Sequence, residues 1–136
     1  MAGETILVVE DEPLVGAELQ ELLIELGYST PEVVDDGCQA LEAFREFQPD
    51  LILMDIRIKG AFDGVETAAR IRQTSDVPII FVTAYSDPAI VARIAAVRPD
   101  GLILKPFRER DLEVNIARII EGRKGQAAES PPPDDP

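Results

Sequence analysis

"TILVVEDEP", residues 5–13, passes from an uninterrupted apolar run into three consecutive carboxylates and a proline. Apolar residues that follow one another without alternation are typical of a strand covered on both faces, as in a parallel sheet. Four more short runs follow, "STPEVV" at 29–34, "LILM" at 51–54, "PIIFV" at 78–82 and "LIL" at 102–104. The chain therefore predicts five buried strands, the first of which ends in a block of negative charge.

Between these runs, apolar residues recur at spacings of three and four, which predicts helices beginning near Pro13, Asp36, Val65, Asp87 and Glu109. Strands that alternate with helices predict an α/β fold, a flavodoxin-like doubly wound (βα)5 unit with a parallel five-stranded sheet. Pro31 removes a ladder donor from the second strand, so that strand belongs at an edge. This placement agrees with the strand order 2-1-3-4-5.

The chain has 136 residues and a net charge of −13. Its length favours a single domain, expected over residues 1–123, with residues 124–136 forming a disordered, proline-rich acidic tail or linker. The negative charge argues against nucleic acid binding, which depends on Lys and Arg. No apolar run is long enough to cross a membrane, and the single cysteine suits a reducing, cytoplasmic location.

Chemistry-bearing residues gather at the carboxyl ends of the predicted strands: Glu10 and Asp11 after the first, Asp55 after the third, Thr83 after the fourth and Lys105 after the fifth. Parallel strands bring these ends to one edge of the sheet, where ligands bind in such folds. Two carboxylates ~5 Å apart repel each other by about 3 kcal/mol at an effective dielectric constant of roughly 20.

Lys105 offsets one of these charges, and hard oxygen ligands suit Mg²⁺ as the cation that offsets the others. A hydroxyl and an ammonium group beside a metal can hold a phosphoryl group. Because the chain has no histidine, a carboxylate is the natural covalent acceptor. The edge therefore predicts a magnesium-dependent phosphoryl site.

Each residue also has a purely structural interpretation. Asp11 or Glu12 can cap the helix that begins near Pro13, and Asp55 can cap the turn that follows it. Two other functions use similar folds. A magnesium-dependent phosphohydrolase often has a second acid two residues after the first, where this chain has Arg57. A flavodoxin-like cofactor protein requires a phosphate loop rich in Ser, Thr and Gly after the first strand, where this chain has "EDEP".

The motifs "VVEDEP", "PDLILMDI", "FVTAYSD" and "LILKPF" resemble, in order and spacing, the receiver domain of two-component response regulators over residues 4–122. The resemblance implies that Asp55 is the phosphoacceptor and that the peptide bond before Pro106 is cis. It also implies a metal site and two phosphoryl-binding groups. The metal would be held by Glu10, Asp11, Asp55 and the backbone carbonyl of Arg57, and the phosphoryl group by Thr83 and Lys105.

The function implied by the resemblance is phosphorylation of Asp55 by a sensor histidine kinase or a histidine phosphotransferase. The signal would pass to a downstream protein effector, with a possible homodimer through the fourth helix, fifth strand and fifth helix. Such a domain is not an enzyme beyond its own phosphorylation and dephosphorylation. Passing the phosphate onward in a phosphorelay, and a degenerate receiver that serves as a scaffold, are the alternatives.

The chain departs from the family pattern at several positions. Leu102 stands where receivers commonly have an aromatic residue, and the segment "IRIKGAFDG" (56–64) is one residue longer than usual and lacks a proline. Large side chains at Arg57 and Tyr85 resemble those of receivers that lose phosphate slowly. We therefore expect a differently shaped loop beside Asp55 and a long-lived aspartyl phosphate.

Overall fold

The computed structural model describes residues 3–84 and 87–129, without the side chains of 124–129. It contains five parallel strands in the order β2-β1-β3-β4-β5, which confirms the predicted fold and topology. The strands are β1 (Ile6–Val9), β2 (Val33–Val34), β3 (Leu51–Met54), β4 (Ile79–Thr83) and β5 (Gly101–Leu104). The helices are α1 (Pro13–Glu25), α2 (Gly37–Phe47), α3 (Gly64–Arg72), α4 (Pro88–Ala96) and α5 (Glu109–Glu129).

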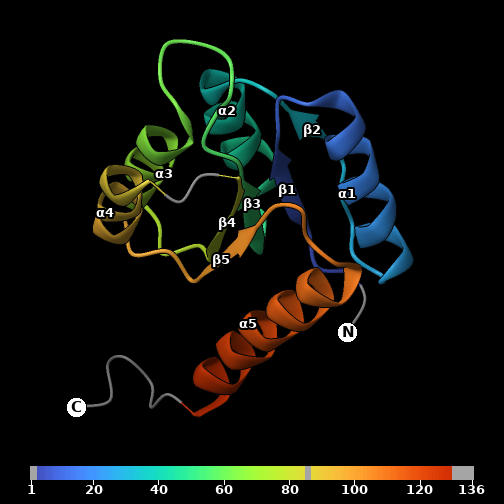
Figure 1. Cartoon of the computed structure of the whole chain (residues 1–136). Helices are drawn as coiled ribbons and strands as arrows, with labels where there is room; N and C mark the ends of the chain where they lie inside the picture. The colour runs from blue at the N-terminus through green and yellow to red at the C-terminus, as the bar shows by residue number, and fades with distance from the viewer. Residues whose placement is uncertain (1–2, 85–86, 130–136) are drawn as a thin grey trace, which may run out of the picture.

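The sheet is the middle of three layers, with α1 and α5 against one face and α2, α3 and α4 against the other (Figure 1). Successive residues of a strand point to opposite faces, so both faces need apolar side chains. In β1, Ile6 and Val8 pack toward α1 and α5, whereas Leu7 and Val9 pack toward the other helices. This double coverage explains the uninterrupted apolar runs.

The second strand is shorter than the sequence predicted. Only Val33 and Val34 pair with β1, and Ser29 forms an isolated bridge to Thr5 on the other side of Pro31. Because proline has no backbone N–H, it interrupts the ladder at this position. As predicted, the strand with the proline lies at the edge of the sheet.

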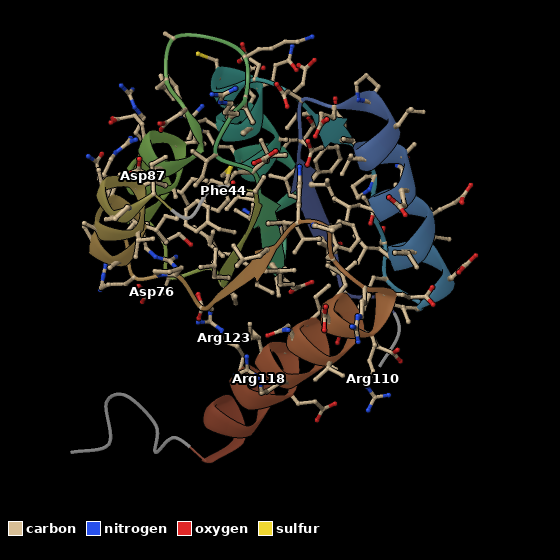
Figure 2. The ribbon with its side chains drawn as sticks, in the orientation of Figure 1. Phe44, Asp76, Asp87, Arg110, Arg118 and Arg123 are labelled. Atoms are coloured by element: carbon tan, nitrogen blue, oxygen red, sulfur yellow. The ribbon has the colours of Figure 1, made fainter. Side chains whose placement is uncertain are left out.

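Helix ends follow their local sequence signals. The Asp36 side chain accepts from the backbone N–H of Gln39, and Asp87, labelled in Figure 2 at the start of α4, accepts from that of Ala89. Helix α5 differs from expectation because it continues to Glu129, so residues 124–129 are helical rather than part of an irregular tail. Residues 130–136 lie outside the described residues. Within the part of the chain that is described, no helix is long and apolar enough to cross a membrane.

Arg72 joins four segments at the amino edge of the sheet. Its guanidinium group donates to the carbonyl oxygens of Val97 (3.1 Å), Arg98 (3.2 Å) and Val77, and to the Asp100 carboxylate (3.0 Å). The Asp100 carboxylate also accepts from the N–H of Ile79 at 3.0 Å. The Arg72 side chain is 8% exposed, and its hydrogen bonds to Val77 and Val97 are partly buried, whereas those to Arg98 and Asp100 are exposed. One side chain thus links the ends of α3 and α4 to the starts of β4 and β5.

We predict that Arg72→Met lowers the free energy of unfolding by about 2–4 kcal/mol, because several partly buried acceptors lose their donor. Arg118→Met is the matched control. Arg118, labelled on α5 in Figure 2, is exposed and donates to Asn115 of its own helix. The control should change stability by no more than about 0.5 kcal/mol. Urea unfolding of both variants tests this, and equal losses would contradict the assigned role of Arg72.

Candidate functional site

The carboxyl ends of β1, β3, β4 and β5 meet at one edge of the sheet. There, a hollow of about 310 Å³ is lined by Asp11, Glu12, Asp55, Arg57, Ala84 and Lys105. Asp55 follows β3 and is 6% exposed, and Glu10 follows β1 and is 3% exposed. The topology places carboxylates from two strands beside a lysine from a third.

Lys105 is the centre of the site. Its ammonium nitrogen lies 2.9 Å from Glu10 Oε1, 3.0 Å from Asp55 Oδ2 and 3.3 Å from Glu12 Oε1. An ammonium group has three N–H donors, so these three carboxylates can occupy all of them. Although burial lowers the pKa of Lys105, hydrogen bonds to Glu10 and Asp55 outweigh it and raise that pKa above its ordinary value. Lys105 is therefore firmly protonated.

The pKa of Glu10 is also raised, which for a carboxyl group disfavours the charged form. Burial, together with the charge of Asp55, raises its pKa from 4.5 to about 7, despite the hydrogen bond from Lys105. One ammonium group lies near four carboxylates here, the three that Lys105 binds and that of Asp11. The edge therefore carries an excess of negative charge that one lysine does not neutralise.

Three of these acids can share a cation. Glu10, Asp11 and Asp55 each offer a carboxylate oxygen, and these three oxygens lie within 4.8 Å of one another. Carboxylate oxygens at such separations suit a small divalent cation such as Mg²⁺, which also keeps several waters. The donor set and the uncompensated charge both fit a hard metal ion.

The first helix does not use these acids as caps. Glu12 is the N-cap residue of α1, yet it makes no side-chain capping hydrogen bond, and its own N–H donates to Glu10 Oε2 at 3.2 Å. The capping interpretation of Glu12 is therefore wrong. Asp55 does make a local bond, since its Oδ1 accepts from the N–H of Ile56 at 2.7 Å. Its other oxygen binds Lys105.

The remaining predicted residues lie at the same edge. Thr83, the last residue of β4, is fully buried, and its neighbour Ala84 lines the hollow. The carbonyl oxygen of Thr83 accepts from the N–H of Lys105 at 2.9 Å, which joins β4 to β5 beside the site. Arg57 is exposed and lines the hollow. The Lys105–Pro106 bond is cis.

Gly64 positions the segment that follows Asp55, a role that was not predicted from the sequence. Its N–H donates to the carbonyl oxygen of Ile56 at 2.7 Å. A Cβ atom on residue 64 would overlap the backbone carbonyl of Asp55, so only glycine allows α3 to begin this close to β3. Glu12 was also missed as a partner of Lys105. Its place in the acidic block was the available signal, but it equally suited a helix cap.

Comparison with known proteins places this geometry in a family. A family model described as the response regulator receiver domain matches residues 6–117. The DNA-binding response regulator MtrA of Mycolicibacterium smegmatis is 33% identical over 126 residues, which cover 93% of this chain and 54% of MtrA. The chain spans about half the length of the curated relatives that it matches.

Solved structures agree. The signal receiver domain of a modulated diguanylate cyclase from Desulfovibrio desulfuricans G20 is 37% identical, with a TM-score of 0.84 over 90% of this chain and 98% of that one. The receiver domain of the sensor histidine kinase PA1611 from Pseudomonas aeruginosa, solved with a magnesium ion in its active site cleft, is 32% identical. Its TM-score is 0.79, over 88% of this chain and 99% of that one. Fold, site and matches agree that this chain belongs to the response regulator receiver domain family.

Proposed function

We propose that this receiver domain accepts a phosphoryl group on Asp55 from a phosphohistidine of a sensor kinase or phosphotransfer protein, in a magnesium-dependent reaction. The observation that carries the proposal is the contact of Lys105 with both Glu10 and Asp55, beside three carboxylates spaced for one cation. A phosphohydrolase of the kind considered above often has a second acid where this chain has Arg57, and a flavodoxin-like protein requires a phosphate loop where it has "EDEP".

In the transfer, a carboxylate oxygen of Asp55 attacks the phosphorus atom. A P–O bond forms while the P–N bond to the donor imidazole breaks, and the imidazole keeps the electron pair and takes up a proton. Glu10, Asp11, Asp55 and the carbonyl of Arg57 would hold Mg²⁺, which when bound neutralises charge on the phosphoryl oxygens. Lys105 already contacts Asp55 and can follow the new oxygens. Hydrolysis of the acyl phosphate by water restores the carboxylate.

The output is proposed to be a change in protein contacts. A phosphoryl group adds about two negative charges and three acceptor oxygens to the site. Thr83 and Lys105 move toward Asp55 to meet them, which displaces the segment that leads into α4. Exposed apolar side chains lie on the neighbouring elements, Val91 on α4, Leu102 and Leu104 on β5 and Val114 on α5. They suit a protein effector or a second copy of this chain.

Other features of the proposal follow from the same site. The domain catalyses only its own phosphorylation and dephosphorylation, and it acts in the cytoplasm, where kinases of this kind present their phosphohistidine. Handing the phosphate onward to a phosphotransferase uses the same chemistry. MtrA is named for DNA binding, but the basic surface that DNA requires is not expected of a chain with net charge −13.

Asp55 is the predicted site of phosphorylation. With acetyl phosphate and Mg²⁺, the wild-type protein should gain about 80 Da, the mass of one phosphoryl group, because Asp55 is the acceptor. Asp55→Asn should gain nothing, and chelation of Mg²⁺ should abolish the gain in the wild type. Intact-mass spectrometry measures all three. Asp36→Asn, which changes an aspartate at the start of α2, is the control and should still be labelled.

The stability of the metal-free protein should depend on pH through Glu10. Since the pKa of Glu10 is about 7 in the metal-free folded protein and 4.5 ordinarily, its charged form is disfavoured by folding. Its contribution to stability is therefore present below pH 4.5 and is lost as the pH rises to about 7. Glu10→Gln should remove this loss in chelator, whereas Glu42→Gln, at an exposed position, should keep it. Urea unfolding at several pH values measures both.

Magnesium should restore stability to the wild type at neutral pH, because an ion that binds only the folded state stabilises it by mass action. Glu10→Gln should show a smaller gain than the Glu42→Gln control. If Mg²⁺ stabilises neither protein, the acidic edge is not a metal site.

Arg57 should lengthen the lifetime of the aspartyl phosphate. Arg57 is exposed and lines the hollow, so it can shield the phosphoryl group from water. Arg57→Asn should hasten hydrolysis by about two- to tenfold, a change of up to about 1.4 kcal/mol in the barrier. Arg118→Asn is the distant control. Tyr85, proposed to act in the same way, lies outside the described residues. Unchanged decay of labelled Arg57→Asn would refute the shielding.

A further inference from the structure

The segment between Asp55 and α3 is a well-anchored element, visible as the green loop between α2 and α3 in Figure 1. Lys59 pairs with the start of α2 through its backbone, since its N–H donates to the carbonyl of Asp35 at 2.8 Å and it bridges Asp36. Its ammonium group also lies 3.1 Å from the Asp35 carboxylate. The longer loop is thus fastened to the β2–α2 junction.

Phe62 provides a second anchor for this segment. A Cβ atom on Gly37 would lie 2.5 Å from the Phe62 ring, so the ring packs directly on the backbone of α2. On its other side, the Arg70 guanidinium carbon lies 4.2 Å from the centre of the ring. The ring is thus held between α2 and α3, which fixes the position of the next residue, Asp63.

Asp63 ends this segment and accepts hydrogen bonds from two helices, α3 and α4. As the N-cap of α3, its Oδ1 accepts from the N–H of Glu66 at 2.9 Å. Arg93 of α4 donates to Oδ2 at 2.8 Å and to Oδ1 at 3.1 Å. Partial burial raises the pKa of Asp63, but these hydrogen bonds outweigh it and hold the pKa below its ordinary value. The pair is therefore charged at neutral pH.

Helix α4 has less apolar burial than α3, so its position depends more on polar contacts such as this ion pair. Both α3 and α4 have nine residues, but five are buried in α3 and only Ile94 is buried in α4. Just beyond Arg93, which lies in the last turn of α4, Arg72 binds the carbonyl oxygens of Val97 and Arg98. With so little apolar burial, polar ties contribute a large share of what keeps α4 in place.

We propose that the Asp63–Arg93 ion pair is a latch that holds α4 in its resting position and weakens when Asp55 is phosphorylated. This inference rests on the proposed function. Thr83 and Ala84 lead into α4 through a short segment, so a movement of Thr83 toward the phosphoryl group displaces the helix. Asp63 does not follow, because its own segment is anchored on α2. The two ends of the ion pair must then separate.

The latch predicts a coupling that can be measured. Asp63→Asn keeps a capping side chain but removes the charge, and Arg93→Gln removes its partner. In the unmodified protein, each variant should speed hydrogen exchange of α4 amides about two- to fivefold, the range expected for an exposed ion pair. Each should also tighten the binding of beryllofluoride with Mg²⁺ by a similar factor, because the resting state is less favoured. The double variant should exceed neither single variant.

Two matched controls separate the latch from general effects of charge. Glu42→Gln removes an exposed carboxylate from α2, and Arg118→Gln removes an exposed arginine from α5. Neither should alter exchange in α4 or beryllofluoride affinity. The latch is overturned if the two variants behave like these controls, or if their effects simply add in the double variant.

The experiment also separates the latch from the proposed function. A wild-type protein that binds no beryllofluoride in the presence of Mg²⁺ would overturn the phosphoacceptor assignment. The exchange rates are measured without either ligand, so they still establish or refute the ion pair as the tie that holds α4.

Discussion

The crowding of carboxylates around one ammonium group is the constraint on which the rest of this molecule depends. A parallel sheet brings the carboxyl ends of β1, β3 and β5 together, and this chain ends the first two in acids. Lys105 meets three of those acids and does not balance their charge, while burial together with the charge of Asp55 raises the pKa of Glu10. The three acids and the unbalanced charge fit a divalent cation, on which the proposed phosphoryl transfer depends.

The two edges of the sheet are therefore built for different tasks. At the amino edge, Arg72 at the end of α3 donates to carbonyl groups and a carboxylate at the end of α4 and before β4 and β5, which stabilises the junctions between them. At the carboxyl edge, four carboxylates crowd around one ammonium group, an arrangement that fits the proposed cation site. Helix α4 is tied by contacts of both kinds. Arg72 binds the carbonyl group that follows its carboxyl end, and Arg93 binds Asp63 in the segment that follows Asp55. A change at the site can thus move α4 against a fixed end.

The sequence predicted what has a local or periodic signal. Continuous apolar runs predicted the strands, Pro31 predicted the edge strand, and strand ends brought Glu10, Asp55 and Lys105 together. It missed the Asp63–Arg93 pair and the contacts of Arg72 with Val97, Arg98 and Asp100, which join residues 25–30 positions apart. Such contacts depend on how helices sit on the sheet, and no spacing along the chain encodes them. The extension of α5 to Glu129 was missed because composition alone favoured a tail.

Leu102 shows how the signal can travel in this chain. Receivers commonly have an aromatic ring at this position, but Leu102 is 44% exposed on the edge strand and has no ring to insert. The backbone offers another route, because Thr83 accepts from the N–H of Lys105 and both residues serve the same site. Under the proposed function, movement of Thr83 toward Asp55 is expected to carry Lys105 and β5 with it. In the proposed switch, a backbone hydrogen bond and an ion pair take the place of a rotating aromatic side chain.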